Sequence, residues 1–191
     1  MPESVFALKQ PAMIEIKTAL SSVREDLEVY AGVYHNVFLV KKSAVGELLK
    51  REKNATRIIF SINGKGRIHR ALSPSGDGEY FILINQDIVK QYQLEPGEEV
   101  SLQILPDDSE YGMPLPEELA ELWSVDEAAY TVFHKLTPGK QRGLIYQVSK
   151  PKGAATRIKK AVQICEYLKS VNGKLDQKEL NAYMKADNEN W

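Results

Sequence analysis

The pattern of apolar residues changes at about Pro106, and this change is the feature that most limits the fold. Before Pro106, short runs rich in β-branched and aromatic residues alternate with turn sequences, among them Asn63-Gly64 and the segment 73–78. After Pro106, apolar residues recur at three- and four-residue steps, as expected for helices that bury one face. The sequence therefore predicts an α+β protein, with strands in its first half and helices in its second half.

Two segments of the first half share the order of strand, polar break and short amphipathic helix. They are "VFLVKKSAVGELL" (37–49) and "YFILINQDIVKQY" (80–92), in which Val45 and Ile88 occupy equivalent places. Each segment is followed by another strand-like run. Two such units can close one barrel around a pseudo-twofold axis, which leaves no free sheet edge. The alternative is a similarity that arose by chance.

The predicted barrel domain spans residues 1–106, and a helical domain spans residues 116–191. The intervening "DDSEYGMPLP" carries acids, a glycine and two prolines, which predicts a linker over residues 107–115.

Two of the predicted helices are marked by prolines. Thr137 and Pro138 form an expected N-cap and first-turn proline, and Pro151 lies at or near the start of the next helix. That helix has an expected apolar stripe made of Ile158, Ala161, Val162, Cys165 and Leu168.

Charge is strongly segregated in a chain whose formal net charge is only −1. Residues 95–127 contain eleven acids and no Lys or Arg, whereas residues 135–174 contain ten basic residues and one acid. Such a basic segment can mark a surface that binds polyanions. Alternatively, the two segments lie side by side and neutralise each other, since segments close in the chain tend to be neighbours in the fold.

The basic segment supplies the candidate binding residues. Cations in the first turn of a helix oppose its dipole, and a bound phosphate would remove that penalty. The candidates for contact with an anion or a partner are Lys140, Arg142, Lys150, Lys152, Thr156, Arg157 and Lys160. Three interpretations remain open: structural ion pairing with Arg157 clamped to a carboxylate, nucleic-acid contact through a helix-turn-helix, or a surface for a protein partner.

Catalytic and metal-binding residues are not predicted. His35, His69 and His134 lie in different predicted elements, and no spacing places two of them on one helical face. Cys165 lies in an apolar stripe, which favours a buried thiol, and a single cysteine is compatible with a reducing compartment. The glycines of "NGKGR" lack the length and ending of a phosphate-binding loop. The sequence therefore predicts no cofactor, no metal and no enzymatic activity.

The N-terminal residues have no basic flank followed by a long apolar stretch, so a signal peptide is not predicted. No run approaches the ~20 apolar residues that span a bilayer. We therefore expect a cytoplasmic protein that does not insert into a membrane.

Two stretches resemble known bacterial families. "LSPSGDGEYFILINQDIVKQYQLEPGEEVSLQIL" resembles the barrel domain of unknown function that often precedes the YdeI/OmpD-associated domain, and its Leu94, Gly97 and Val100 fit a pattern of AbrB/MazE-like barrels. "LPEELAEL" and "FHKLTPGKQRGLIYQVSKPKGAATRIKKAV" resemble the YdeI/OmpD-associated domain itself. The resemblance covers roughly residues 33–170 and is most specific over 136–160. Residues 153–155 depart from it, because family members often carry an acid there.

The resemblance implies a double-split barrel formed within one chain, followed by an all-helical domain. The family is also called bacteriocin-protection, which implies a stress or envelope role and names no reaction. We therefore expect a non-enzymatic, stress-related protein that binds an unknown protein or an anionic ligand. Two alternatives are a nucleic-acid-binding regulator that uses the basic helix start and the barrel, and an enzyme that holds an anionic substrate at residues 156–160.

Overall fold

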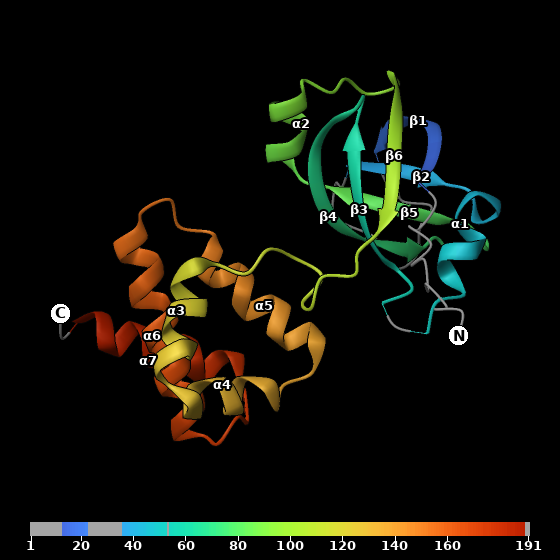
Figure 1. Ribbon diagram of the computed structural model, residues 1–191. Helices are drawn as coiled ribbons and strands as arrows, with labels where there is room; N and C mark the ends of the chain where they lie inside the picture. The colour runs from blue at the N-terminus through green and yellow to red at the C-terminus, as the bar shows by residue number, and fades with distance from the viewer. Residues whose placement is uncertain (1–12, 23–35, 53, 190–191) are drawn as a thin grey trace, which may run out of the picture. The chain divides into compact units, whose positions relative to one another are not determined.

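The computed structural model describes residues 13–22, 36–52 and 54–189. The predictions made for His35 and for the N-terminal segment fall outside these ranges. Within them, a closed antiparallel barrel of six strands precedes five helices, which confirms the α+β class and the single-chain barrel (Figure 1). The chain divides into two compact units that meet between Asp108 and Ser109.

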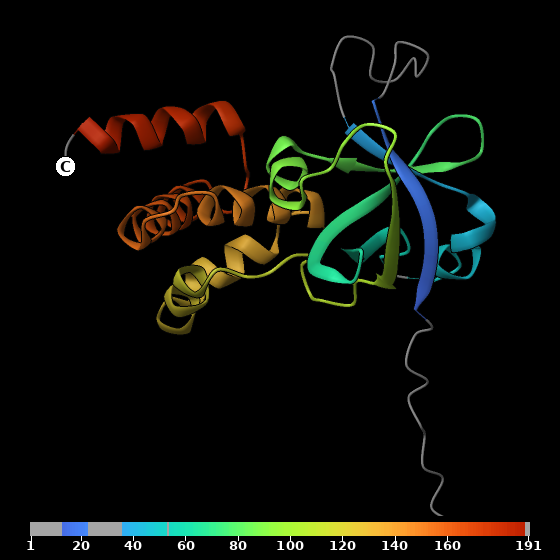
Figure 2. The ribbon, with the colours of Figure 1, turned by 90° about the horizontal axis from the view of Figure 1, so that it is seen from above.

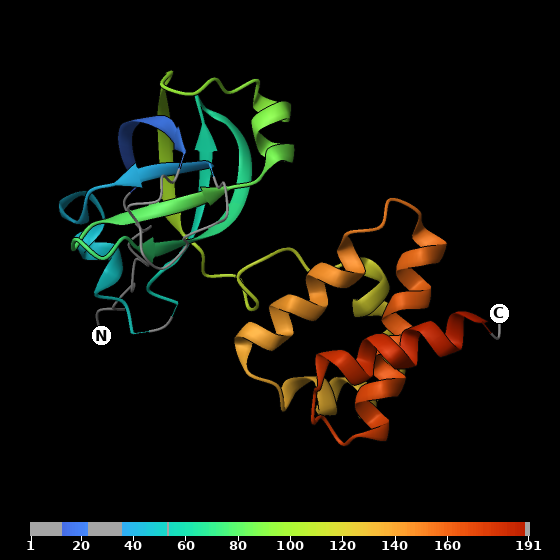
Figure 3. The ribbon, with the colours of Figure 1, turned by 180° about the vertical axis from the view of Figure 1, so that it is seen from behind.

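The barrel strands follow one another around the ring in the order β1-β2-β5-β4-β3-β6. Helix α1 follows β2, helix α2 follows β5, and the two helices lie on opposite sides of the barrel (Figure 3). The element bounds are β1 (Ile14–Ser22), β2 (Asn36–Val40), α1 (Lys42–Leu49), β3 (Arg57–Ile62), β4 (Lys65–Pro74), β5 (Tyr80–Ile84), α2 (Gln86–Tyr92) and β6 (Glu99–Pro106).

The strand pairing has an internal twofold symmetry. Exchanging β1 with β4, β2 with β5 and β3 with β6 leaves the ring order unchanged. Strand β1 passes from β6 to β2, and in the same way β4 passes from β3 to β5. The pair Leu20–Phe38 in one half corresponds to the pair Leu72–Ile82 in the other. The internal repeat is therefore present in the fold and includes β1 and β4 as well.

The predicted alignment of the two repeats is wrong by one residue in the strands. Along β2 and β5 the patterns of burial match when Val37 is equivalent to Phe81 and Phe38 to Ile82. Val45 and Ile88, the residues predicted to be equivalent, are both buried, but they lie four and three residues after the N-cap residues Lys41 and Asn85. The one-residue shift therefore falls within the first helical turn, where a sequence comparison without gaps does not show it.

The barrel is held together by an apolar interior and tight turns. Phe38 and Phe60 meet edge to face, with their ring centroids 6.4 Å apart. The predicted hairpin turn joins β3 to β4 through Asn63 and Gly64, which both have positive φ.

The helical unit is built around α6, which contacts each of the other four helices described in this unit. Helix α7 lies on one side of α6 and the pair α3 and α4 on the other (Figure 2). The bounds are α3 (Glu117–Val125), α4 (Glu127–His134), α5 (Pro138–Ser149), α6 (Ala154–Ser170) and α7 (Gln177–Glu189).

The predicted apolar stripe of α6 is only partly correct. Ala161, Cys165 and Leu168 are buried as expected, but Ile158 is 51% exposed and Val162 is 39% exposed. The buried residues of α6 also include Gln163, Ile164 and Tyr167, which the prediction left out. Because neighbouring helices cover α6 on two sides, its buried surface is wider than one stripe and leaves out the edge that carries Ile158 and Val162.

The two predicted helix starts agree in position with the structure. Thr137 takes the N-cap position of α5 with Pro138 in the first turn, but its hydroxyl makes no capping hydrogen bond. Helix α6 begins at Ala154, three residues after Pro151.

In the predicted linker, Asp107 and Tyr111 are both buried, Asp107 in the barrel unit and Tyr111 in the helical unit.

Candidate functional site

The predicted binding residues do not form one patch. Lys140 and Arg142 lie at the start of α5, and a helix rise of 1.5 Å per residue places Lys140 about 15 Å from Lys150 along the axis. The ammonium of Lys140 donates to the carbonyl of Leu175 at 3.2 Å. It lines a hollow of about 410 Å³ between the start of α5 and the loop before α7. Lys150, Lys152, Thr156, Arg157 and Lys160 lie between the end of α5 and the second turn of α6.

Arg157 is a structural clamp. Its Nε donates to Oε1 of Glu118 on α3 at 2.6 Å, and its Nη1 donates to the carbonyls of Pro151 at 3.3 Å and Lys152 at 2.8 Å. The apolar stripe expected on α6 does not include Arg157 and predicts that its side chain projects away from the packed face. This prediction is wrong, because the side chain is half-buried one turn before the buried Ala161. The guanidinium thus ties α3 and the α5–α6 connection to the start of α6.

A second ion pair joins the acidic and basic segments. Lys169 on α6 donates to Oδ2 of Asp126 and to Oε1 of Glu166, both at 2.7 Å. The other carboxylate oxygen of Asp126 caps α4 by accepting from the backbone N–H of Ala129 at 2.9 Å. Lys169 and this cap together lower the pKa of Asp126 below its ordinary 3.8, and the two carboxylates raise the pKa of Lys169. The two charged segments therefore neutralise each other at these contacts.

The Asp126→Asn variant isolates the charge of this contact, because asparagine caps a helix about as well as aspartate. The folded-state pKa of Asp126 is lowered, so its stabilising charge is present above the ordinary value of 3.8 and lost as pH falls through the folded value. We expect the variant to melt a few degrees below the wild type at about pH 7, with a difference that shrinks toward about pH 2. A difference that stays constant over this range would contradict the pairing.

Four predicted cations stay unengaged. Arg142, Lys150, Lys152 and Lys160 make no side-chain hydrogen bond or ion pair with other residues in the described part of the chain. Thr156 is exposed in the first turn of α6. These residues are available for contact with a partner, whereas Arg157 and Lys169 of α6 are engaged by carboxylates.

The groups most suited to chemistry are held in structural roles. Burial raises the pKa of the Cys165 thiol to about 11, and the neighbouring indole of Trp123 lowers it only in part. His134 donates from Nδ1 to the carbonyl of Tyr130 at 2.7 Å, and its Nε2 lies 2.8 Å from the hydroxyl oxygen of Tyr111. No group of three or more His, Cys, Asp or Glu side chains within the described residues is placed to hold a metal ion.

A buried acid–histidine pair lies in the barrel unit. Oδ2 of Asp107, at the end of β6, is 2.8 Å from Nδ1 of His69 on β4, and Asp107 is fully buried. The two residues are distant in the sequence and meet only because β3 lies between β6 and β4 in the ring. Sequence reasoning missed this pair because Asp107 falls in the predicted linker.

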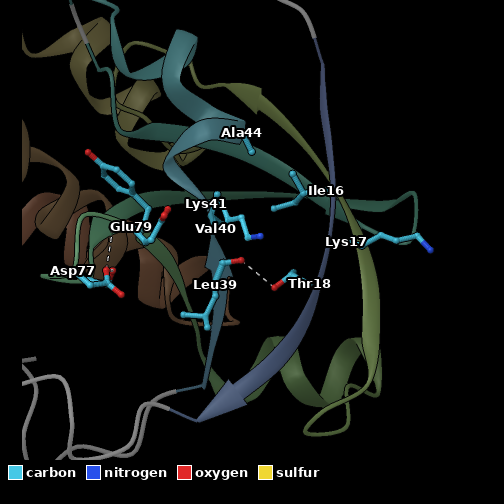
Figure 4. A pocket seen from close by; sticks show the side chains of 11 residues that line it. Ile16, Lys17, Thr18, Leu39, Val40, Lys41, Ala44, Asp77 and Glu79 are labelled. Atoms are coloured by element: carbon cyan, nitrogen blue, oxygen red, sulfur yellow. Dashed lines mark hydrogen bonds between the residues drawn. The ribbon is translucent and has the colours of Figure 1, made fainter.

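A pocket opens at the seam between β1 and β2. The ladder between these strands ends at Leu20 and Phe38, and beyond this point the hydroxyl of Thr18 donates to the carbonyl of Leu39 at 3.0 Å (Figure 4). The space has a volume of about 580 Å³. Its walls are mainly apolar and come from Ile16, Leu39, Val40, Ala44 and Tyr80.

Four charged residues line this seam pocket. Lys17 points away from the other lining residues and pairs with Glu99 at 3.2 Å (Figure 4). Glu79 caps α1 by accepting from the backbone N–H of Lys42, the first residue of a helix whose own N-cap makes no side-chain bond. The hydroxyl of Ser75 and the backbone N–H of Glu79 both bond to Asp77 and lower its pKa.

The last of the four, Lys41, lies at the start of α1. Its ammonium has no partner among the described residues. It is the least constrained charge at the pocket.

The barrel symmetry supplies a second copy of the seam, between β4 and β5. There Arg70 takes the place of Thr18, and its Nε donates to the carbonyl of Leu83 at 3.2 Å, just as Thr18 donates to the equivalent Leu39. One seam is therefore spanned by a long side chain, whereas the other has a short side chain beside the pocket. Only a repeat that included residues 14–22 and 65–74 could have revealed this asymmetry in the sequence.

A comparison with known protein families finds a match within the helical unit. Residues 113–170 match the family described as Bacteriocin-protection, YdeI or OmpD-Associated. This match includes the most specific part of the predicted resemblance. No curated protein and no solved structure matches the chain. Among the helices that the structure describes, none has the length and apolar character needed to cross a membrane.

Proposed function

We propose that this chain, which carries a YdeI/OmpD-associated match in its helical unit, is a non-enzymatic binding protein whose ligand occupies the seam pocket. The observation that carries the proposal is the open seam beside Thr18, at a position where the symmetry-related seam is spanned by Arg70. Its volume lies within the ~300–1,000 Å³ of typical ligand pockets, and apolar walls with a few polar groups are the usual composition of such sites.

In the helical unit, the side chains most suited to catalysis are engaged or buried. Arg157 and Lys169 are engaged by carboxylates, and the Cys165 thiol is buried with a raised pKa. On this proposal the ion pairs keep the helices in one arrangement. The family description supports a further part of the proposal, that ligand binding serves protection against a stress such as a bacteriocin.

The Thr18→Arg variant tests the proposal by filling the seam as Arg70 fills its counterpart. Three small probes of similar length are titrated by ligand-observed NMR: n-butylguanidine, pentanoate and 1-pentanol. We expect at least one probe to bind the wild type and to lose at least about tenfold in affinity in the variant. Thr131→Arg, which changes an exposed threonine of the helical unit, is the matched control and should bind as the wild type does.

The possible results distinguish a ligand in the seam pocket from a ligand that binds elsewhere. Thermal unfolding of Thr18→Arg first establishes that the variant is folded. Binding that is equal in the wild type and Thr18→Arg would place the ligand elsewhere. If none of the three probes binds the wild type, the proposed function is wrong.

Nucleic-acid binding is a second candidate, favoured by the four unengaged cations Arg142, Lys150, Lys152 and Lys160. It predicts affinity for DNA or RNA that falls steeply with salt, because each phosphate contact releases counterions. Electrophoretic mobility shift at two salt concentrations, with the triple variant Lys150→Ala, Lys152→Ala and Lys160→Ala, tests it. Binding that the triple variant leaves unchanged would rule out this surface.

A further inference from the structure

We infer that the ligand of the seam pocket carries an alkylguanidinium or alkylammonium group of the kind found on an arginine side chain. The inference deepens the proposed function and depends on it. Its basis is the equivalence of Thr18 and Arg70: the barrel itself fills one of two symmetry-related seams with a guanidinium and leaves the other open.

The first step of the argument is the hydrogen-bonding position. Arg70 directs its Nε to the carbonyl of Leu83 and its Nη1 to the carbonyl of His69. In the open seam the carbonyl of Leu39 is the equivalent acceptor, and the Thr18 hydroxyl takes one of its two lone pairs. A ligand that reproduces the arrangement of Arg70 must carry a hydrogen-bond donor, because the carbonyl of Leu39 is a hydrogen-bond acceptor.

The second step is the charge of the lining. Asp77 and Glu79 border the pocket. Each carboxylate has one oxygen that makes no hydrogen bond with another described residue. Lys17 points out of the pocket and pairs with Glu99. The carboxylates favour a cationic head group, which forms stronger, charge-assisted hydrogen bonds with them.

The third step is the shape and polarity of the walls. Ile16, Leu39, Val40 and Ala44 surround the seam, and methylene groups of a basic side chain pack on such surfaces while the charged end stays at the polar rim. A ligand with an aliphatic stem and a cationic end therefore fits both parts of the site. It could be a small molecule or an arginine side chain of a partner protein, which share this chemistry.

Lys41 is the cation among the described lining residues that has no partner, so it opposes a cationic ligand and provides a sharp test. Its ammonium is unpartnered in the described chain, whereas the equivalent residue Asn85 is neutral and caps α2 by accepting from the N–H of Ile88. Changing Lys41 to its symmetry-related residue, Lys41→Asn, should strengthen the binding of a cation several-fold and weaken the binding of an anion.

The experiment compares n-butylguanidine, pentanoate and 1-pentanol on the full-length chain by NMR titration. We expect n-butylguanidine to bind at least about fivefold more tightly than either other probe, more tightly still to Lys41→Asn, and more weakly to Asp77→Asn. Asp87→Asn, which removes an acid from the first turn of α2, is the control and should leave the affinity unchanged.

Failure of the inference differs from failure of the proposed function. Pentanoate or pentanol binding best, with loss in Thr18→Arg, would overturn the inference and keep the pocket as the binding site. Weaker binding of n-butylguanidine to Lys41→Asn would also overturn it. The peptide acetyl-Gly-Arg-Gly-amide, compared with its Gln counterpart, separates the two sources: binding tighter than that of n-butylguanidine indicates a partner protein, and weaker binding a small molecule.

Discussion

The Asp107→Ala variant is expected to lose about 3 kcal/mol of unfolding free energy, because removal of this buried carboxylate leaves the side chain of His69 without its hydrogen-bond partner in the barrel unit. Asp107 is fully buried, and its carboxylate lies 2.8 Å from Nδ1 of His69, whose side chain is only 14% exposed. The backbone N–H of Asp107 also donates to the carbonyl of Arg57, so the residue lies where β6 ends beside β3. Urea denaturation followed by far-UV circular dichroism measures the loss.

The adjacent residue provides a matched control for this prediction. Asp108 pairs with Arg51, but its side chain is 65% exposed, and exposed ion pairs contribute about 0–1 kcal/mol. Asp108→Ala should therefore unfold close to the wild type. If the two variants lose equal stability, burial of Asp107 is not what makes its carboxylate important.

The Arg157→Leu variant is the second change with a large expected effect. It removes three hydrogen bonds and leaves the carboxylate of Glu118, which is 11% exposed, without its guanidinium partner. We expect the midpoint of thermal unfolding to fall by roughly 10 °C. Fluorescence of Trp123, which lies on α3 with Glu118, reports the transition of the helical unit.

Lys160→Leu is the counterpart of Arg157→Leu on the same helix. Lys160 has no side-chain partner within the described residues, so its replacement should shift the midpoint by little. A binding role for Arg157 predicts the opposite pattern, with unchanged stability and a loss of affinity for an anion. Equal midpoints for the wild type and Arg157→Leu would therefore contradict the clamp.

The architecture was predictable because its signals are local. Alternating apolar residues and the Asn63-Gly64 turn predict the hairpin of β3 and β4, and the apolar period after Pro106 predicts the helices. The opposed charges of the two segments left two interpretations open, and the ion pairs Arg157–Glu118 and Lys169–Asp126 support the one in which the segments are in contact.

The incorrect predictions concern the buried face of α6, which depends on the helices that pack against it. Ile158 and Val162 have the spacing of a buried stripe, yet the neighbouring helices leave that edge of α6 exposed. The same spacing placed Arg157 away from the packed face, although its partner Glu118 draws it in. Periodicity gives the faces of a helix, but only the packing decides which face is buried.

The seam pocket was not predictable from composition or motifs. It lies beside Thr18, a short residue at the position that Arg70 has in the other seam, and the two positions become comparable only when β1 and β4 are known to be equivalent. Asp77 and Glu79 reach it from the loop between β4 and β5, far from Thr18 in the sequence. A site assembled from three separated segments leaves no contiguous pattern.

The difference between the two seams is tested most directly by chemical-shift mapping of the wild-type protein with n-butylguanidine. We predict that the backbone amides of Ile16, Leu39 and Ala44 shift on titration, while those of Ile68 and Leu83 at the Arg70 seam do not. Equal shifts at both seams, or shifts confined to the helical unit, would contradict a ligand site created by the short side chain of Thr18.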